Sequence, residues 1–133
     1  MYEEQLLDLK IEKLEKLLKL DDLLIEAMER EDMDSIASLM EEKFMVINEI
    51  KVIDNKLKDK RKEKNFSEQR EKKLRYIKEV LNRLKNKEEK LLYMAYEKMS
   101  HIENELEQIE EVLKINKKYK RIKEKKNIFE RVG

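Results

Sequence analysis

Apolar residues recur along this chain at intervals of three, four or seven, which is the period of one face of an α-helix. The first such series predicts a helix over about residues 3–30. Its members are Leu7, Ile11, Leu14, Leu18, Ile25 and Met28. Additional leucines widen its apolar stripe beyond what one neighbouring helix would cover. We therefore expect this helix to be buried on more than one side, in a chain of at least three helices.

The second series runs from Ile36 to Leu57 and predicts a helix over about residues 33–64. Asp32 precedes it, and its carboxylate suits the N-cap position because it can accept hydrogen bonds from backbone N–H groups of the first turn. The two predicted helices are each about 30 residues long and are joined by a short turn. These lengths predict an antiparallel helical hairpin.

The third series predicts a long helix over about residues 68–118, followed by a basic C-terminal tail over 119–133. Glu88 and Lys98 interrupt its apolar positions. Because Asn86 and the glutamate three residues later resemble a capping box, a break near residues 85–90 is the alternative to a continuous helix.

The composition favours an all-α fold. Charged residues make up 47% of the chain, 32 basic against 31 acidic; proline and cysteine are absent, and the single glycine is Gly133. Without helix breakers, helix should run nearly from end to end. We expect a single helical domain over 1–133, a coiled-coil-like bundle of three to four helices. The chain shows neither a signal-peptide pattern nor a long apolar run, which favours a cytoplasmic protein.

The residues needed for catalysis are not grouped in a recognisable pattern. His101 is the only histidine, and one histidine cannot complete a di-iron site of the bundle type. Carboxylates recur beside lysines at helical spacing, which is typical of a solvated helix face. We therefore expect a protein that is not an enzyme, has no cofactor or metal, and has no small-molecule substrate.

Charge is divided along the chain. Residues 1–50 contain 15 acidic and 6 basic residues, whereas residues 114–133 contain 9 basic and 2 acidic residues. The basic tail could contact nucleic acid or an anionic membrane surface. The acidic first half would repel the same polyanion, so we favour a solvated tail or one that docks on a protein.

The run LLIEAMEREDMDSIASLMEEK, residues 23–43, resembles the corner between the first two helices of the flagellar type III export chaperones of the FliT/FlgN kind. Their pattern is an apolar helix end, a Gly/Glu-Asp pair, an apolar-Asp step and a Glu-rich start to the second helix. IKEVLN at 77–82 resembles the opening of their third helix, and NKKY at 116–119 resembles the step after their final helix. The chain differs at Glu31, where many members have glycine, and in its lysine-rich tail.

The resemblance implies a cytoplasmic chaperone that binds an amphipathic terminal helix of a late flagellar substrate, either the filament cap or a hook–filament junction protein. Such a chaperone prevents premature assembly and delivers its client to the export apparatus. By similarity, contacts with these partners would fall on the third helix and tail, at Leu92, Met99, Ile102, Leu106, Ile109, Leu113 and Tyr119. Packing within the chain is the alternative for all seven residues, and for Leu106 and Ile109 it is the favoured interpretation.

Three alternatives stay open at this point. The same composition could build a structural coiled-coil adaptor, such as a stalk component of an export ATPase. The basic tail could make this a nucleic-acid-associated helical protein. The third alternative concerns the oligomeric state: the chain could form a homodimer.

Overall fold

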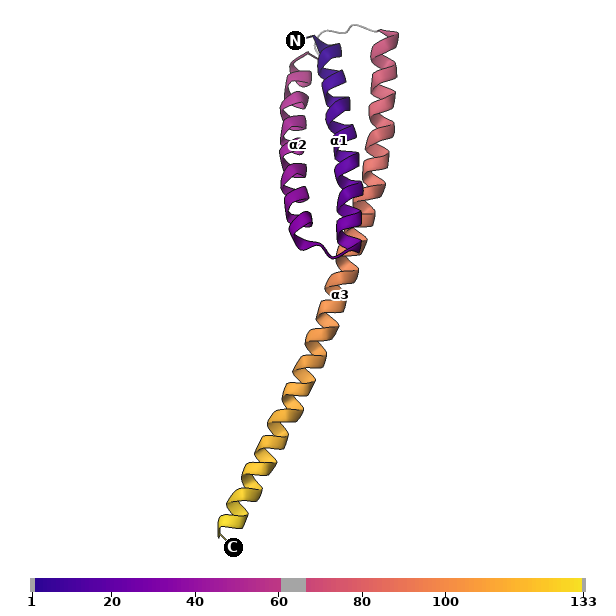
Figure 1. Ribbon diagram of the computed structural model, residues 1–133. Coiled ribbons are helices and arrows are strands. Elements are labelled where there is room, and N and C mark those ends of the chain that lie inside the picture. The colour runs from indigo at the N-terminus through magenta and orange to yellow at the C-terminus, as the bar shows by residue number, and fades with distance from the viewer. Residues whose placement is uncertain (1, 61–66, 133) are drawn as a thin grey trace. The chain divides into compact units, whose positions relative to one another are not determined.

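The computed structural model describes residues 2–60 and 67–132, with side chains described as far as residue 126, and its elements are three α-helices (Figure 1). These are α1 (Glu3–Glu29), α2 (Met33–Lys60) and α3 (Glu68–Val132). Neither described range contains a strand. The predicted all-α class, with a hairpin and a long third helix, is confirmed. The chain divides into two units, one reaching Met94 and one starting at Ala95.

The corner between α1 and α2 follows from three consecutive residues. Arg30 ends α1, and its backbone N–H donates to the carbonyl of Glu26. Glu31 has φ 56°, the left-handed conformation that a side chain disfavours and that glycine adopts readily. Asp32 then caps α2, because its carboxylate accepts from the Ser35 backbone N–H at 3.2 Å and from the Ser35 hydroxyl at 2.6 Å. The predicted N-cap is therefore present.

The predicted end of the third helix differs from the one observed, because the helix expected to end near residue 118 continues to Val132. Residues 85–90 lie inside this helix, so the alternative of a break there does not apply. Both observations have the same cause. Residues 68–132 contain neither proline nor glycine, so the weak capping signal at Asn86 competes against good helix formers on both sides and loses. The predicted residues 61–64 of the second helix lie outside the described residues.

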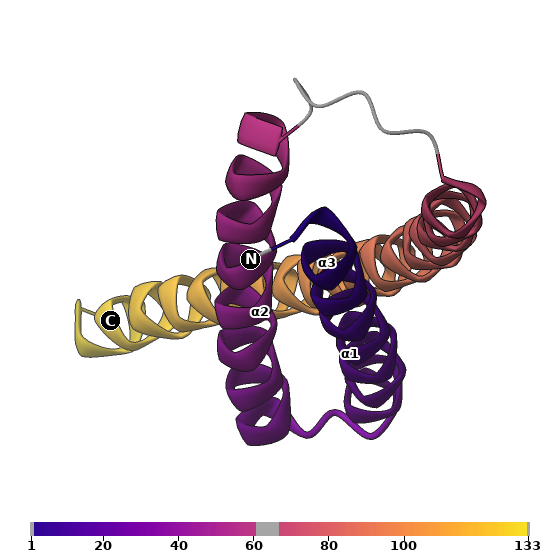
Figure 2. The same ribbon diagram turned by 90° about the horizontal axis from the view of Figure 1, so that it is seen from above.

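In the first unit, α1 lies between α2 and the beginning of α3 (Figures 1 and 2). Three ion pairs join α1 to α2, and the residue numbers fall along α2 as they rise along α1. They connect Lys10 to Asp54 at 2.7 Å, Lys13 to Glu49 at 2.5 Å and Lys16 to Glu42 at 3.5 Å. The two helices are therefore antiparallel, as predicted.

The other flank of α1 is acidic and faces basic residues of α3. The contacts join Glu3 to Arg70 at 2.8 Å, Asp8 to Lys73 at 2.9 Å, and Asp22 to Lys87. The residue numbers rise together, so α1 and α3 run parallel. Exposed pairs of this kind are each worth about 0–1 kcal/mol, so they determine which helix faces meet more than they stabilise the fold.

The stability of the first unit comes from an apolar core to which all three helices contribute. Leu6 and Leu24 of α1, Val46 of α2 and Val80 of α3 are each at most 1% exposed. Leu7, Leu14, Leu17 and Leu20 join them, along with Ile53, Leu57, Ile77 and Leu84. The broad stripe of α1 is buried by two neighbours, which confirms that it is covered on more than one side.

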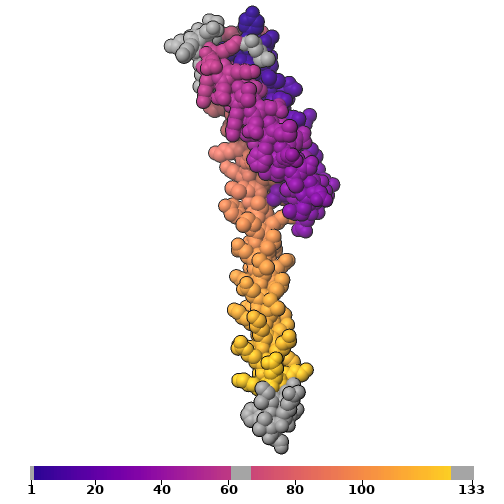
Figure 3. Space-filling model, turned by 90° about the vertical axis from the view of Figure 1, so that its left-hand side faces the viewer, coloured from indigo at the N-terminus to yellow at the C-terminus, as the bar shows by residue number. Residues whose placement is uncertain are grey.

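The second unit is a single helical segment, the part of α3 from Ala95 onward. Its described side chains surround one helix axis (Figure 3). Every residue from Met99 to Lys126 is classed as exposed. Since a lone helix offers its own apolar side chains no opposing surface, the second unit cannot bury them by itself.

Candidate protein-binding surface

Four apolar residues of the second unit form a continuous exposed stripe along α3. Ile102, Leu106, Ile109 and Leu113 are 55%, 53%, 55% and 55% exposed. Their spacings of four, three and four residues place them on one helix face. Leu106 and Ile109, for which packing within the chain was the favoured interpretation, are exposed, because the second unit offers them no opposing surface. We call these four residues the α3 stripe.

The three remaining predicted residues lie outside the α3 stripe, and all are exposed. Met99 and Tyr119, at 56% and 68%, lie on the same helical segment. Leu92, at 58%, belongs to the first unit. Six of the seven predicted residues are therefore carried by one helical segment of the second unit.

Three further exposed apolar residues of this helix were not among those predicted from the sequence. Val112, Ile115 and Ile122 are 56%, 65% and 65% exposed. Val112 borders a shallow hollow with Ile109 and Leu113. Together with Tyr119, the three follow spacings of three and four, a signal that could have been found in the sequence. They form a second apolar face of α3, on a different side of the helix from the α3 stripe and nearer its C-terminal end.

The exposure of this surface contrasts with that of the same residue types in the first unit. Ile77, Leu84 and Leu91 of α3 are 6%, 8% and 9% exposed. Isolated apolar residues at a surface need no explanation, but a contiguous series suggests an interaction surface. Here the series on one helix face runs from Met99 to Leu113, about four helical turns.

The charges around this surface change sign along the helix. Residues 97–111 contain six acidic side chains and one lysine. Residues 114–126 contain eight basic side chains and one glutamate. A helix docked along the α3 stripe would therefore meet an acidic border at one end and a basic border at the other.

Metal-binding and membrane-spanning features are both missing from the described ranges. No group of three or more His, Asp or Glu residues within 2–60 and 67–132 could hold a metal ion, and His101 is exposed. No described helix has an apolar stretch long enough to cross a membrane.

An ionic cluster of two buried residues, Asp21 and Lys43, and the exposed Glu88 connects the three helices of the first unit. Asp21 of α1 is completely buried, and its Oδ1 lies 3.0 Å from the Nζ of Lys43 on α2. The same ammonium group donates to Oε1 of Glu88 on α3. One lysine thus joins two carboxylates from two other helices. The interrupted position at Glu88 was visible in the sequence, whereas nothing marked Asp21 and Lys43 as its partners.

The protonation behaviour of the cluster follows from burial and from its single cation. Burial, followed by the neighbouring Glu88 carboxyl group, raises the pKa of Asp21 to about 6 despite the attraction of Lys43. Burial acts to lower the pKa of Lys43, but its bonds to Glu88 and Asp21 outweigh this and raise it. Burial acts to raise the pKa of Glu88, but the neighbouring Asp21 carboxyl group and the bond from Lys43 outweigh this and lower it. The charge of Asp21 therefore depends on pH between its ordinary range and about 6.

Comparison with known proteins does not assign this chain to a family. No family model, no curated protein and no solved structure matches it.

Proposed function

We propose that this protein binds an amphipathic helix of another protein along the α3 stripe and keeps that helix from assembling prematurely. The observation that carries the proposal is the exposure of more than half of each of Ile102, Leu106, Ile109 and Leu113. An amphipathic helix laid against these residues would bury its own apolar face in the same contact. Such binding needs neither a cofactor nor a covalent step.

The energy available from this contact suits reversible binding. Complete burial of one large aliphatic side chain is worth about 1.5–3 kcal/mol, so the exposed halves of four would supply roughly 3–6 kcal/mol. The partner's apolar face adds a similar amount, while lost translational freedom and side-chain ordering oppose both. A complex of this kind can form and still release its client.

The partner class rests on the resemblance of residues 23–43 to flagellar export chaperones. One structural observation supports that resemblance: Glu31, which replaces the glycine of many members, has the left-handed conformation in which glycine is favoured. We therefore propose a cytoplasmic, non-enzymatic chaperone that binds a terminal helix of the filament cap or of a hook–filament junction protein. The export apparatus would be its second partner.

The test is co-elution of the purified protein with the C-terminal helices of these flagellar proteins. Ile102→Asp and Ile109→Asp should each weaken the complex by tenfold or more, since each places a charge in an apolar contact. Asn104→Asp is the matched control, because it adds the same charge to the same segment outside the α3 stripe. Helicity measured by circular dichroism should be equal in all three variants.

Two results would contradict this proposal. Absence of binding to any flagellar cap or junction protein would reject the chaperone function. Equal binding by Ile102→Asp and Asn104→Asp would reject the α3 stripe as the site. Retention of the protein on DNA that falls steeply with salt would favour the nucleic-acid alternative through residues 114–126.

A further inference from the structure

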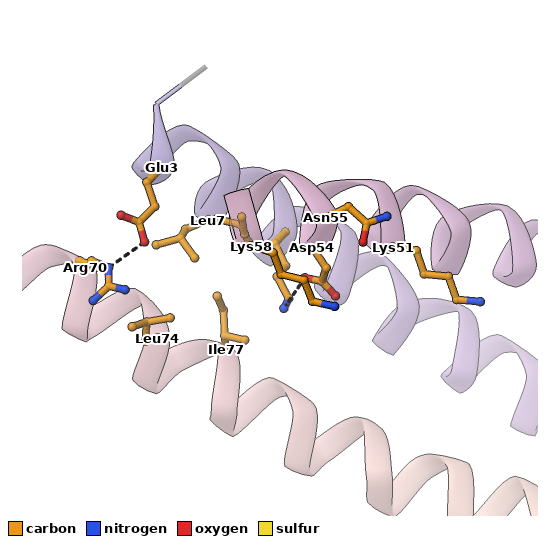
Figure 4. A pocket seen from close by; sticks show the side chains of 11 residues that line it. Glu3, Leu7, Lys51, Asp54, Asn55, Lys58, Arg70, Leu74 and Ile77 are labelled. Atoms are coloured by element: carbon orange, nitrogen blue, oxygen red, sulfur yellow. Dashed lines mark hydrogen bonds and ion pairs between the residues drawn. The ribbon is translucent and has the colours of Figure 1, made fainter. Parts of the chain in front are cut away.

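A groove in the first unit opens between α2 and the first turns of α3, with α1 at its base (Figure 4). Its volume is about 620 Å³. Leu7 of α1 and Leu74 and Ile77 of α3 point into the same space, and Leu57 of α2 also lines it. The groove therefore has an apolar floor contributed by three helices, in which Leu74 is half-buried and Leu7, Leu57 and Ile77 are buried.

The rim of the groove carries two positive charges that have no ion-pair partner among the described residues. Arg70 pairs with Glu3, and Lys10 pairs with Asp54. The remaining two cations, Lys51 and Lys58, are exposed, and no described carboxylate lies within ion-pair distance of either. They are seven residues apart on α2, about 10 Å along the helix. An occupant needs apolar side chains for the interior and carboxylates two helical turns apart for the rim.

The second unit of this chain meets both requirements. Glu103 and Glu110 are seven residues apart, and Leu106 and Ile109 lie between them. All four side chains are exposed. The spacing of the two glutamates equals that of Lys51 and Lys58 on α2.

The direction of docking follows from the charges beyond these pairs. If Glu110 lies at Lys51 and Glu103 at Lys58, the docked helix runs antiparallel to α2. Its basic residues 114–126 then approach the turn between α1 and α2, where residues 26–34 contain five acidic side chains and one arginine. The opposite direction would place residues 114–126 beside the basic C-terminal end of α2, where Lys58 and Lys60 lie in its last turn. Charge complementarity therefore favours the antiparallel direction.

We infer that the groove of one chain binds residues 99–113 of α3 from a second copy, with Glu103 at Lys58 and Glu110 at Lys51. The groove and residues 99–113 are two different surfaces. If each of two chains binds the other's residues 99–113 in its own groove, the two contacts close a dimer. It covers the residues to which we assign client binding, so a client would have to displace the second copy. The inference does not depend on the proposed function, because both surfaces belong to this chain.

Charge reversal on each surface tests this contact. Sedimentation velocity of the wild-type protein should show an average mass that rises with concentration. The variants K51E/K58E and E103K/E110K should each self-associate roughly tenfold more weakly, since two attractive pairs become repulsive. Combining all four changes in one chain should restore association, because the charges again oppose each other. K56E and E97K, which reverse exposed charges outside the groove lining and outside residues 99–113, should behave like the wild type.

The outcomes separate this inference from the proposed function, since no client is present in the experiment. A wild-type protein that stays monomeric at every concentration would overturn it. Failure of the four-fold variant to regain association, with helicity intact, would show that these residues do not face each other and would also overturn it. Restored association supports it, whatever the result of the flagellar binding experiment.

Discussion

Replacing Lys43 by methionine tests how the ionic cluster stabilises the first unit. Methionine keeps much of the apolar length of lysine and removes its charge. Asp21 is completely buried, so it cannot exchange its lost partner for water. Removing one partner of a buried pair typically costs about 3–5 kcal/mol. A domain with a total stability of 5–15 kcal/mol would lose a large part of it.

The unpaired Asp21 carboxylate causes this loss of stability, so replacing Asp21 by a neutral residue should reverse most of the loss. In an Asp21→Asn background, Lys43→Met should cost about 2 kcal/mol less than in the wild type, because no buried charge is left unpaired. The cost should also shrink as pH falls. Without Lys43, protonation of Asp21 removes the same unpaired charge.

The assay is urea denaturation followed by far-UV circular dichroism, with the free energy of unfolding obtained for both single variants and the double variant. Asp22→Asn is a control, because this neighbouring carboxylate is exposed. A loss below about 1 kcal/mol for Lys43→Met, or equal losses with and without Asp21, would refute a buried pair as the source of stability.

Three other predictions concern stability. Asp21 has a folded pKa of about 6 against its ordinary 3.8, so the folded state binds the proton more tightly than the unfolded state. The free energy of unfolding of the wild type should therefore rise by about 1 kcal/mol from this group as the pH falls from 7 to 5. Urea titrations at each pH should show that Asp21→Asn lacks this rise. Glu31→Gly should stabilise the protein by about 1 kcal/mol, visible as a higher urea midpoint, because glycine suits φ 56°. Leu24→Ala should cost about 2–5 kcal/mol of unfolding free energy, whereas Leu106→Ala should cost less than about 1 kcal/mol, since Leu24 is 1% exposed and Leu106 is 53% exposed. Equal losses for the two leucines would contradict the described difference in burial.

The helices could be predicted from the sequence because apolar spacing, capping residues and composition all indicated helix. Apolar spacing marked all three helices, and the capping chemistry of Asp32 marked the corner between the first two. The end of α3 could not be predicted, because a change from apolar to basic residues alters solvation without breaking a helix. Lysine and arginine are good helix formers, and only glycine or proline would have marked an end.

The candidate surface could be predicted only in part. The spacing of Ile102 to Leu113 predicted an apolar stripe, but a stripe has the same appearance in sequence whether it is buried or exposed. The cluster of Asp21, Lys43 and Glu88 depends on registration between three helices, which no local pattern records. The same is true of the groove, whose lining residues range from Glu3 to Ile77.

Hydrogen exchange of residues 99–113, followed by mass spectrometry, tests the client-binding role of α3 most directly. The protein would be measured alone, at a concentration where it is monomeric, and with the C-terminal helical segment of a flagellar cap or junction protein in excess. We predict slower exchange across Ile102 to Leu113 in the complex, because a docked helix suppresses local opening of α3. Unchanged exchange there, with protection appearing elsewhere on the chain or nowhere, would contradict the assignment of α3 as the client-binding surface.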